Sequence, residues 1–198
     1  MLMLKNGLFP LFLSFASLWC IAQGQPEGLF LGAKVPAFKG IDQFDRPVQL
    51  RELAKKKPVL LVFYRGYWCP YCTRLLARLQ DSLSFFTEKG VSVLAVSPES
   101  KESRIKTLEK TQAGFSLIHD SAYLISKQFD VAYILSDNQL ARYRSGAIDI
   151  LKINYPNPAV LPVPSVFVIG KDYSITYRFF DPDHKRRTNV AELLALFQ

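Results

Sequence analysis

Two cysteines three residues apart are the side chains in this sequence whose type and spacing most directly suggest chemistry. Cys69 and Cys72 enclose Pro70 and Tyr71 in a C-x-x-C motif. On the first turn of a helix, residues three apart lie on one face. Their Cα atoms then approach the roughly 5.5–6 Å separation that a disulfide prefers. The motif therefore predicts two thiols that can close into a disulfide and reopen.

The flanking sequence indicates which thiol is the nucleophile. An apolar run over Val59–Tyr64 stops at Arg65-Gly66, and helical periodicity begins at Pro70. Cys69 would then stand where unpaired backbone N–H groups and the positive end of the helix dipole favour a thiolate. Pro70 suits the first helical position because it has no N–H to leave unpaired. We expect Cys69 to attack and Cys72, one turn inside the helix, to resolve the product.

A C-x-x-C motif can also form half of a zinc site or a structural disulfide. Zinc needs two more ligands, and beyond residue 24 the sequence has no further Cys and only His119 and His184. A disulfide across so short a loop removes little entropy from the unfolded chain. We therefore expect a redox dithiol with no metal and no cofactor, and keep a non-enzymatic soft-metal carrier as an alternative.

Several neighbouring side chains are candidates for supporting the thiol chemistry. Arg65 could stabilise a thiolate or a peroxide, and Trp68 with Tyr67 could shield the site and contact a partner. Ordinary aromatic packing explains Trp68 and Tyr67 equally well. Arg178 and Arg187 are weaker candidates for the role of Arg65, because most arginines at such places are simply solvated.

The segment FYRGYWCPYC, residues 63–72, resembles the thioredoxin superfamily, and most of all the peroxiredoxin-like branch of the AhpC/TSA (redoxin) family. Pro70-Tyr71 is similar to the dipeptide between the cysteines of glutaredoxins, which adds both residues to the expected site. The resemblance covers roughly Gly32 to the C-terminus. It implies an α/β, thioredoxin-like fold, in which helices flank a central mixed β-sheet, as one domain over residues 25–198.

The resemblance also assigns a role to Val163 and Pro164, which precede a second β-branched run. In thioredoxin-like folds, a proline at this position is cis and faces the C-x-x-C motif. The resemblance therefore implies that Pro164 is cis and that the backbone of Val163 pairs with an extended thiol substrate.

One departure from the family affects the expected reaction. Peroxiredoxins normally have Thr or Ser three residues before the peroxide-attacking Cys and Pro seven residues before it. Counted from Cys69, these positions hold Gly66 and Val62, so the hydroxyl that would bind the peroxide is missing. The sequence thus favours a thiol–disulfide oxidoreductase that exchanges electrons with a disulfide substrate and a thioredoxin-like protein or small thiol. A thiol peroxidase acting on hydrogen peroxide or organic hydroperoxides is the alternative.

Residues 1–24 have the composition of a signal peptide. Lys5 gives a positive start, Leu8–Ala22 is apolar, and small residues at Ala22 and Gly24 suit cleavage. The apolar run is shorter than the roughly 20 residues of a membrane-spanning helix. We expect export to the bacterial periplasm without stable membrane insertion after cleavage. A lipid anchor on Cys20 is a less favoured alternative, because bulky Trp19 precedes it.

The remaining sequence predicts one domain built around a strand–helix–strand unit. The formal net charge of +8 is dispersed, and no nucleic-acid motif is present, so we expect no nucleic-acid partner. In Ile134–Leu161 we expect the tyrosines and apolar residues to pack on the sheet rather than to cover the dithiol. The expected elements are a hairpin (38–41 and 47–50), strands (59–64, 91–96, 115–118, 164–169 and 173–180) and helices (51–57, 70–89, 97–110, 121–129, 136–145 and 189–197).

Overall fold

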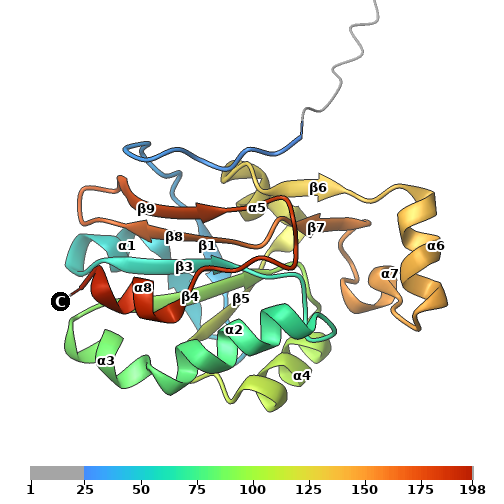
Figure 1. Cartoon of the computed structure of the whole chain (residues 1–198), viewed down its shortest axis with the longest axis horizontal. Helices are drawn as coiled ribbons and strands as arrows, with labels where there is room; N and C mark the ends of the chain where they lie inside the picture. Colours follow the sequence, from blue (N-terminus) through green and yellow to red (C-terminus); the bar gives the residue numbers. More distant parts are fainter. Residues whose placement is uncertain (1–24, 198) are drawn as a thin grey trace, which may run out of the picture.

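A five-stranded mixed sheet forms the centre of the computed structural model, which describes residues 25–197 (Figure 1). The strand order is β5-β4-β3-β8-β9. Strand β3 pairs in parallel with β4 and antiparallel with β8. Every residue of β3 is buried because helices cover both faces of the sheet. The bounds are β3 Val59–Phe63, β4 Ser92–Ser97, β5 Ser116–His119, β8 Ser165–Ile169 and β9 Ile175–Phe180.

One face of the sheet is covered by helices α2 (Pro70–Asp81), α3 (Leu83–Glu88), α4 (Lys101–Thr111) and α8 (Val190–Ala195) (Figure 1). Leucines of α2 spaced three and four apart face this core, as the periodicity predicts. Two expected boundaries are wrong. The chain breaks at Ser82, so residues 70–89 form two helices rather than one. Helix α4 starts later than expected, because the Ser100 hydroxyl caps it by accepting from the Ser103 N–H.

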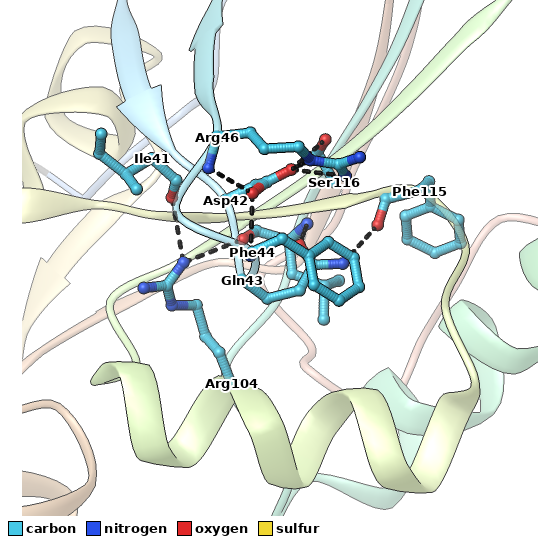
Figure 2. A network of polar contacts seen from close by, with 9 residues as sticks. Ile41, Asp42, Gln43, Phe44, Arg46, Arg104, Phe115 and Ser116 are labelled. Carbon is cyan, nitrogen blue, oxygen red and sulfur yellow. Dashed lines mark hydrogen bonds and ion pairs between the residues drawn. The ribbon is translucent and has the colours of Figure 1, made fainter.

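The other face is covered by α1 (Leu50–Lys56) and α5 (Leu124–Gln128), which follows the short 3-10 helix η1 (Ser121–Tyr123). Strands β1 (Lys39–Ile41) and β2 (Pro47–Gln49) form the predicted antiparallel hairpin. The loop of this hairpin is tied to β5 by polar contacts, in which Arg104 donates to the carbonyls of Ile41 and Leu117 (Figure 2). Hydrogen bonds from Arg46 and Ser116 hold the pKa of buried Asp42 below its ordinary value, although burial opposes them.

A segment between α5 and β8 extends beyond one end of the sheet (Figure 1). It contains β6 (Ala132–Ile134), α6 (Asp137–Ser145), α7 (Ile150–Ile153) and β7 (Val160–Pro162). The predicted helix and its Ser136 cap are confirmed, and Gln139 completes a capping box. The antiparallel β6–β7 pair and α7 were not predicted. We call residues 132–162 the insertion.

The predicted α/β fold, with a central mixed sheet flanked by helices, is confirmed. Asn189 caps α8 at the expected start of the last helix. None of the helices within residues 25–197 is long and apolar enough to cross a membrane. The expected signal peptide, with Cys20, lies outside the described residues.

Candidate active site

The dithiol stands where the central strand β3 passes into helix α2. Cys69 is the N-cap of α2, Pro70 is at its start, and Cys72 lies on its first turn, as predicted. Gly66 makes the connecting turn possible. Its φ is +147°, and a Cβ at Gly66 would lie 2.6 Å from Trp68 Nε1. Any other residue there would displace Trp68 from its place beside Cys69.

The two sulfur atoms are in direct contact with each other and with a guanidinium group. Both cysteines are free thiols and almost fully buried, and the Cys72 thiol donates to Cys69 Sγ at 3.0 Å. Arg187 Nη2 lies 3.2 Å from Cys72 Sγ and 3.9 Å from Cys69 Sγ. The backbone N–H of Arg65 also points at Cys72 Sγ, at 3.5 Å. This geometry lets a disulfide form with little movement.

The two thiols have opposite pKa shifts. The hydrogen bond from the Cys72 thiol lowers the pKa of Cys69 to about 6, aided by the Cys72 backbone N–H and the charges of Arg65 and Arg187, while burial opposes the shift. Burial, together with the neighbouring Cys69, raises the pKa of Cys72 well above its ordinary value. The assignment of Cys69 as attacking thiol and Cys72 as resolving thiol stays a prediction, and these directions support it.

Arg65 is placed beside Cys69 by aromatic contacts. Its side chain is buried, with the guanidinium carbon 4.7 Å from the ring centre of Trp68 and 5.5 Å from that of Tyr143. Its Nη2 donates to the Tyr143 hydroxyl. Arg178 instead donates to the Glu27 carbonyl and stacks on Phe30, away from the sulfurs. Of the two weaker arginine candidates, the structure therefore brings only Arg187 to the dithiol.

A cavity of about 560 Å³ opens beside Cys69 and not beside Cys72. Of the expected site residues, Arg65, Trp68, Pro70, Tyr71 and Val163 line it with Cys69, whereas Pro164 does not. Its other walls come from Gln25, Pro26, Tyr133, Gln139, Arg142, Tyr143, Ile148, Pro182 and His184, none of which was predicted. Cys69 is thus the thiol that a small molecule in the cavity can reach.

The expected cis peptide bond at Val163-Pro164 is wrong. The bond is trans, and the cis bond of the described chain is Tyr155-Pro156. The Val163 N–H donates to the Val131 carbonyl at 2.7 Å, and its carbonyl accepts from the Ser165 hydroxyl at 3.2 Å. The Val163 N–H is therefore engaged within the protein, whereas its carbonyl oxygen has a second lone pair. Pairing of Val163 with an extended substrate stays a prediction.

The insertion contributes to the site, contrary to the expectation that its aromatic residues pack on the sheet. The ring centres of Tyr143 and Trp68 are 5.3 Å apart, and Tyr133 lines the same cavity. Such contacts join residues that are far apart in the sequence; Arg65 and Tyr143, for example, are separated by 78 positions. Sequence periodicity reports only local structure, so it gave no signal for them.

A buried carboxyl group that sequence reasoning missed holds the loop before Cys69. Glu99 is fully buried, and its carboxylate accepts from the Tyr67 N–H and the Thr107 hydroxyl, both at 2.7 Å. Burial raises the pKa of Glu99 to about 7, and these hydrogen bonds oppose the shift. Because β3 and β4 are parallel, the residues that follow them meet at one edge of the sheet. That placement was the available signal for Glu99.

Glu99→Gln should remove a pH-dependent loss of stability. A folded-state pKa near 7, against an ordinary value of 4.5, means that ionisation of Glu99 costs the folded state about 3 kcal/mol. The stability that the neutral carboxyl group of Glu99 gives the folded state is fully present below about pH 4.5. It is lost as the pH rises through 7 and the group ionises. Urea unfolding of the reduced protein at pH 5 and pH 8 measures it.

The matched control is Glu109→Gln, which changes an exposed carboxyl group on helix α4, the helix that follows Glu99. Between pH 5 and pH 8, the unfolding free energy of Glu109→Gln should change as much as that of wild type. The unfolding free energy of Glu99→Gln should fall less than that of wild type over the same range. Equal pH dependence in wild type and Glu99→Gln would show that Glu99 does not titrate in this range.

No group of three or more His, Cys, Asp or Glu side chains that could hold a metal ion occurs in residues 25–197.

Curated proteins to which this chain is similar include peroxiredoxins. The sequence is 33% identical over 103 residues to a putative peroxiredoxin bcp of Haemophilus influenzae, covering 52% of this chain and 66% of that protein. It is 33% identical over 100 residues to the chloroplastic peroxiredoxin Q of Sedum lineare, covering 50% and 53%. These alignments span less than two thirds of the relatives' lengths.

Solved structures share the fold at lower identity. Peroxidoxin BcpB of Mycobacterium tuberculosis matches with a TM-score of 0.65 at 21% identity, over 84% of this chain and 95% of that one. Peroxiredoxin Q of Xanthomonas campestris matches with a TM-score of 0.61 at 19% identity, over 81% and 89%. The AhpC/TSA family profile matches residues 31–178. The chain belongs to the AhpC/TSA family.

Proposed function

We propose that this chain is a thiol-dependent peroxidase in which Cys69 attacks the peroxide and Cys72 closes a disulfide with it. The observation that carries the proposal is the pair of sulfurs 3.0 Å apart, of which only Cys69 faces the cavity. A pKa lowered to about 6 makes the thiolate the predominant form of Cys69 at pH 7, whereas an ordinary cysteine with a pKa of about 8.5 is mostly protonated there. The thiolate is the nucleophilic form.

The reaction balances in two steps. The Cys69 thiolate attacks the terminal peroxide oxygen, the O–O bond breaks, and an alcohol or water leaves once a proton is taken up, so that Cys69 becomes a sulfenic acid. Cys72 then attacks the Cys69 sulfur, and water leaves as the disulfide forms. Arg187, 3.2 Å from Cys72 Sγ, stabilises the negative charge that Cys72 develops in this step. Two electrons from a thioredoxin-like protein or a small thiol restore the dithiol.

Other donors can take the place of the missing hydroxyl at Gly66. Within the described part of the chain, Arg65 Nε and Trp68 Nε1 are buried without a hydrogen-bond partner, and both residues line the cavity. Unsatisfied buried donors are uncommon in folded proteins. A peroxide oxygen beside Cys69 would give such donors an acceptor. These donors therefore support a peroxidase even though no Thr or Ser hydroxyl is present at position 66.

A second candidate is the thiol–disulfide oxidoreductase that the sequence favours. The observation in its favour is that both sulfurs lie on the first turn of one helix, with no hydroxyl at Gly66. In that reaction the Cys69 thiolate attacks a substrate disulfide, and Cys72 displaces the substrate thiol. Family membership and the peroxiredoxin relatives support the peroxidase as the leading proposal.

We also propose that the protein is exported, on the composition of residues 1–24. N-terminal sequencing of the protein from the cells that make it should find a start at about residue 23 or 25. An intact Met1 would contradict cleavage.

Cysteine variants test the assignment of both thiols. With one equivalent of hydrogen peroxide, the reduced wild-type protein should lose two thiols and form the disulfide between Cys69 and Cys72. Cys72→Ser should instead stop at a sulfenic acid on Cys69, which dimedone traps for mass spectrometry. Cys69→Ser should react at least about thirtyfold more slowly than wild type, because the remaining thiol has a raised pKa.

Two results would contradict the proposal in different ways. Rapid sulfenic acid formation on Cys72 in Cys69→Ser would reverse the assigned roles. Slow oxidation of wild type by peroxide, with rapid exchange towards a protein disulfide, would replace the peroxidase by the oxidoreductase.

A further inference from the structure

The cavity beside Cys69 has cationic and aromatic walls and no acidic ones. Arg65 and Arg142 line it, and no Asp or Glu of the described chain does. Burial lowers the pKa of the third basic group, His184, and the nearby charge of Arg65 adds to this effect, which disfavours a positive charge on His184. Two guanidinium groups thus line the cavity against one anionic group, the Cys69 thiolate, which Arg187 also faces. The excess positive charge favours an anion inside the cavity.

Arg65 is a buried cation that lacks a carboxylate partner. It is 2% exposed, none of the ion pairs found among residues 25–197 includes it, and its Nε has no hydrogen-bond partner there. Buried charges are usually paired, because desolvation is costly. Arg65 stacks on Trp68 and Tyr143, donates to the Tyr143 hydroxyl and faces the Cys69 sulfur, but none of these contacts gives its Nε an acceptor. An incoming carboxylate would supply the missing partner.

Arg142 provides a second guanidinium group at the cavity from the insertion. It lies on helix α6, next to Tyr143, is exposed, and takes part in no ion pair within the described range. One guanidinium is thus buried and the other is accessible from solvent. Planar guanidinium groups match the geometry of a carboxylate.

The size and apolar walls of the cavity indicate an organic ligand. A cavity of about 560 Å³ is far larger than hydrogen peroxide requires and falls in the range of small-molecule sites, roughly 300–1,000 Å³. The rings of Trp68, Tyr71, Tyr133 and Tyr143 line it. The ligand that fits these walls has an apolar or aromatic body and a negative group.

We propose that this cavity binds small organic molecules that carry a carboxylate, with Arg142 and Arg65 holding the carboxylate while the reacting atom meets Cys69. The inference rests on the proposed function in that Cys69 is the reacting thiol. The same chemistry could belong to an organic peroxide that oxidises Cys69 or to a small thiol that reduces the disulfide. In either case, the carboxylate orients the molecule and raises its local concentration.

Alkylation with iodoacetate and iodoacetamide tests the charge preference without relying on peroxidase activity. Both reagents form the same S–C bond and release iodide. They differ in that iodoacetate carries a carboxylate and iodoacetamide carries a neutral amide. The ratio of the iodoacetate rate to the iodoacetamide rate at Cys69 should exceed that of a free thiol by about fivefold or more, and should fall as salt is added. Peptide mass spectrometry assigns the alkylated cysteine.

Arg142→Gln should lower this ratio by about fivefold, mainly through the iodoacetate rate. The matched control is Arg144→Gln on the same helix, which does not line the cavity and should keep the wild-type ratio. A wild-type ratio equal to that of a free thiol, or equal effects of the two variants, would overturn the inference but leave the proposed function standing. A Cys69 that is slow with both reagents would overturn both.

Two further pairs of reagents identify the source of the ligand. Monoperoxyphthalic acid and perbenzoic acid oxidise the reduced protein, and 3-mercaptopropionate and 2-mercaptoethanol reduce the oxidised one. The first member of each pair has the additional carboxylate. Arg142→Gln should slow that member selectively in the peroxide pair if the ligand is the oxidant, or in the thiol pair if it is the reductant. No selective effect in either pair would overturn the inference.

Discussion

The stabilisation of a thiolate inside a buried site is the physical constraint on which the rest of this structure depends. Cys69 is only 2% exposed, and burial by itself disfavours a charged sulfur. The hydrogen bond from the Cys72 thiol, the Cys72 backbone N–H and two guanidinium groups outweigh that effect. The same contacts place the Cys72 sulfur 3.0 Å from that of Cys69, close to the distance from which a disulfide can form. In the proposed reaction, activation of Cys69 and resolution by Cys72 would therefore come from one arrangement of atoms.

Four parts of the chain, distant in sequence, build that arrangement. Strand β3 and the turn at Gly66 place the two sulfurs, and the segment before α8 brings in Arg187. The insertion supplies Tyr143, which contacts both Arg65 and Trp68. The loop after β4 supplies buried Glu99, which accepts from the Tyr67 N–H. The thiol chemistry and the shape of the cavity consequently depend on the tertiary fold rather than on the C-x-x-C motif alone.

Local sequence was sufficient for the parts of this site that depend on local structure. The strand, turn, C-x-x-C and helix were predicted, because hydrophobic periodicity and Pro70 act within a few residues. Tyr143 reaches the site through long-range contacts, for which one sequence has no comparable signal. Arg187 was named only as one of two weaker candidates, because its place beside the sulfurs depends on the tertiary fold. The assignment of cis Pro164 failed for another reason. It was carried over from the superfamily, whereas here the Val163 backbone bonds to Val131 and Ser165.

The pH dependence of Cys69 alkylation by iodoacetamide tests the central claim most directly. The wild-type rate should rise with pH through an inflection near 6, because only the thiolate reacts. Arg187→Gln should move the inflection to higher pH, whereas Arg186→Gln, which alters an arginine paired with Asp181, should leave it unchanged. A wild-type inflection near that of an ordinary cysteine, or Cys72 reacting at lower pH than Cys69, would contradict the account.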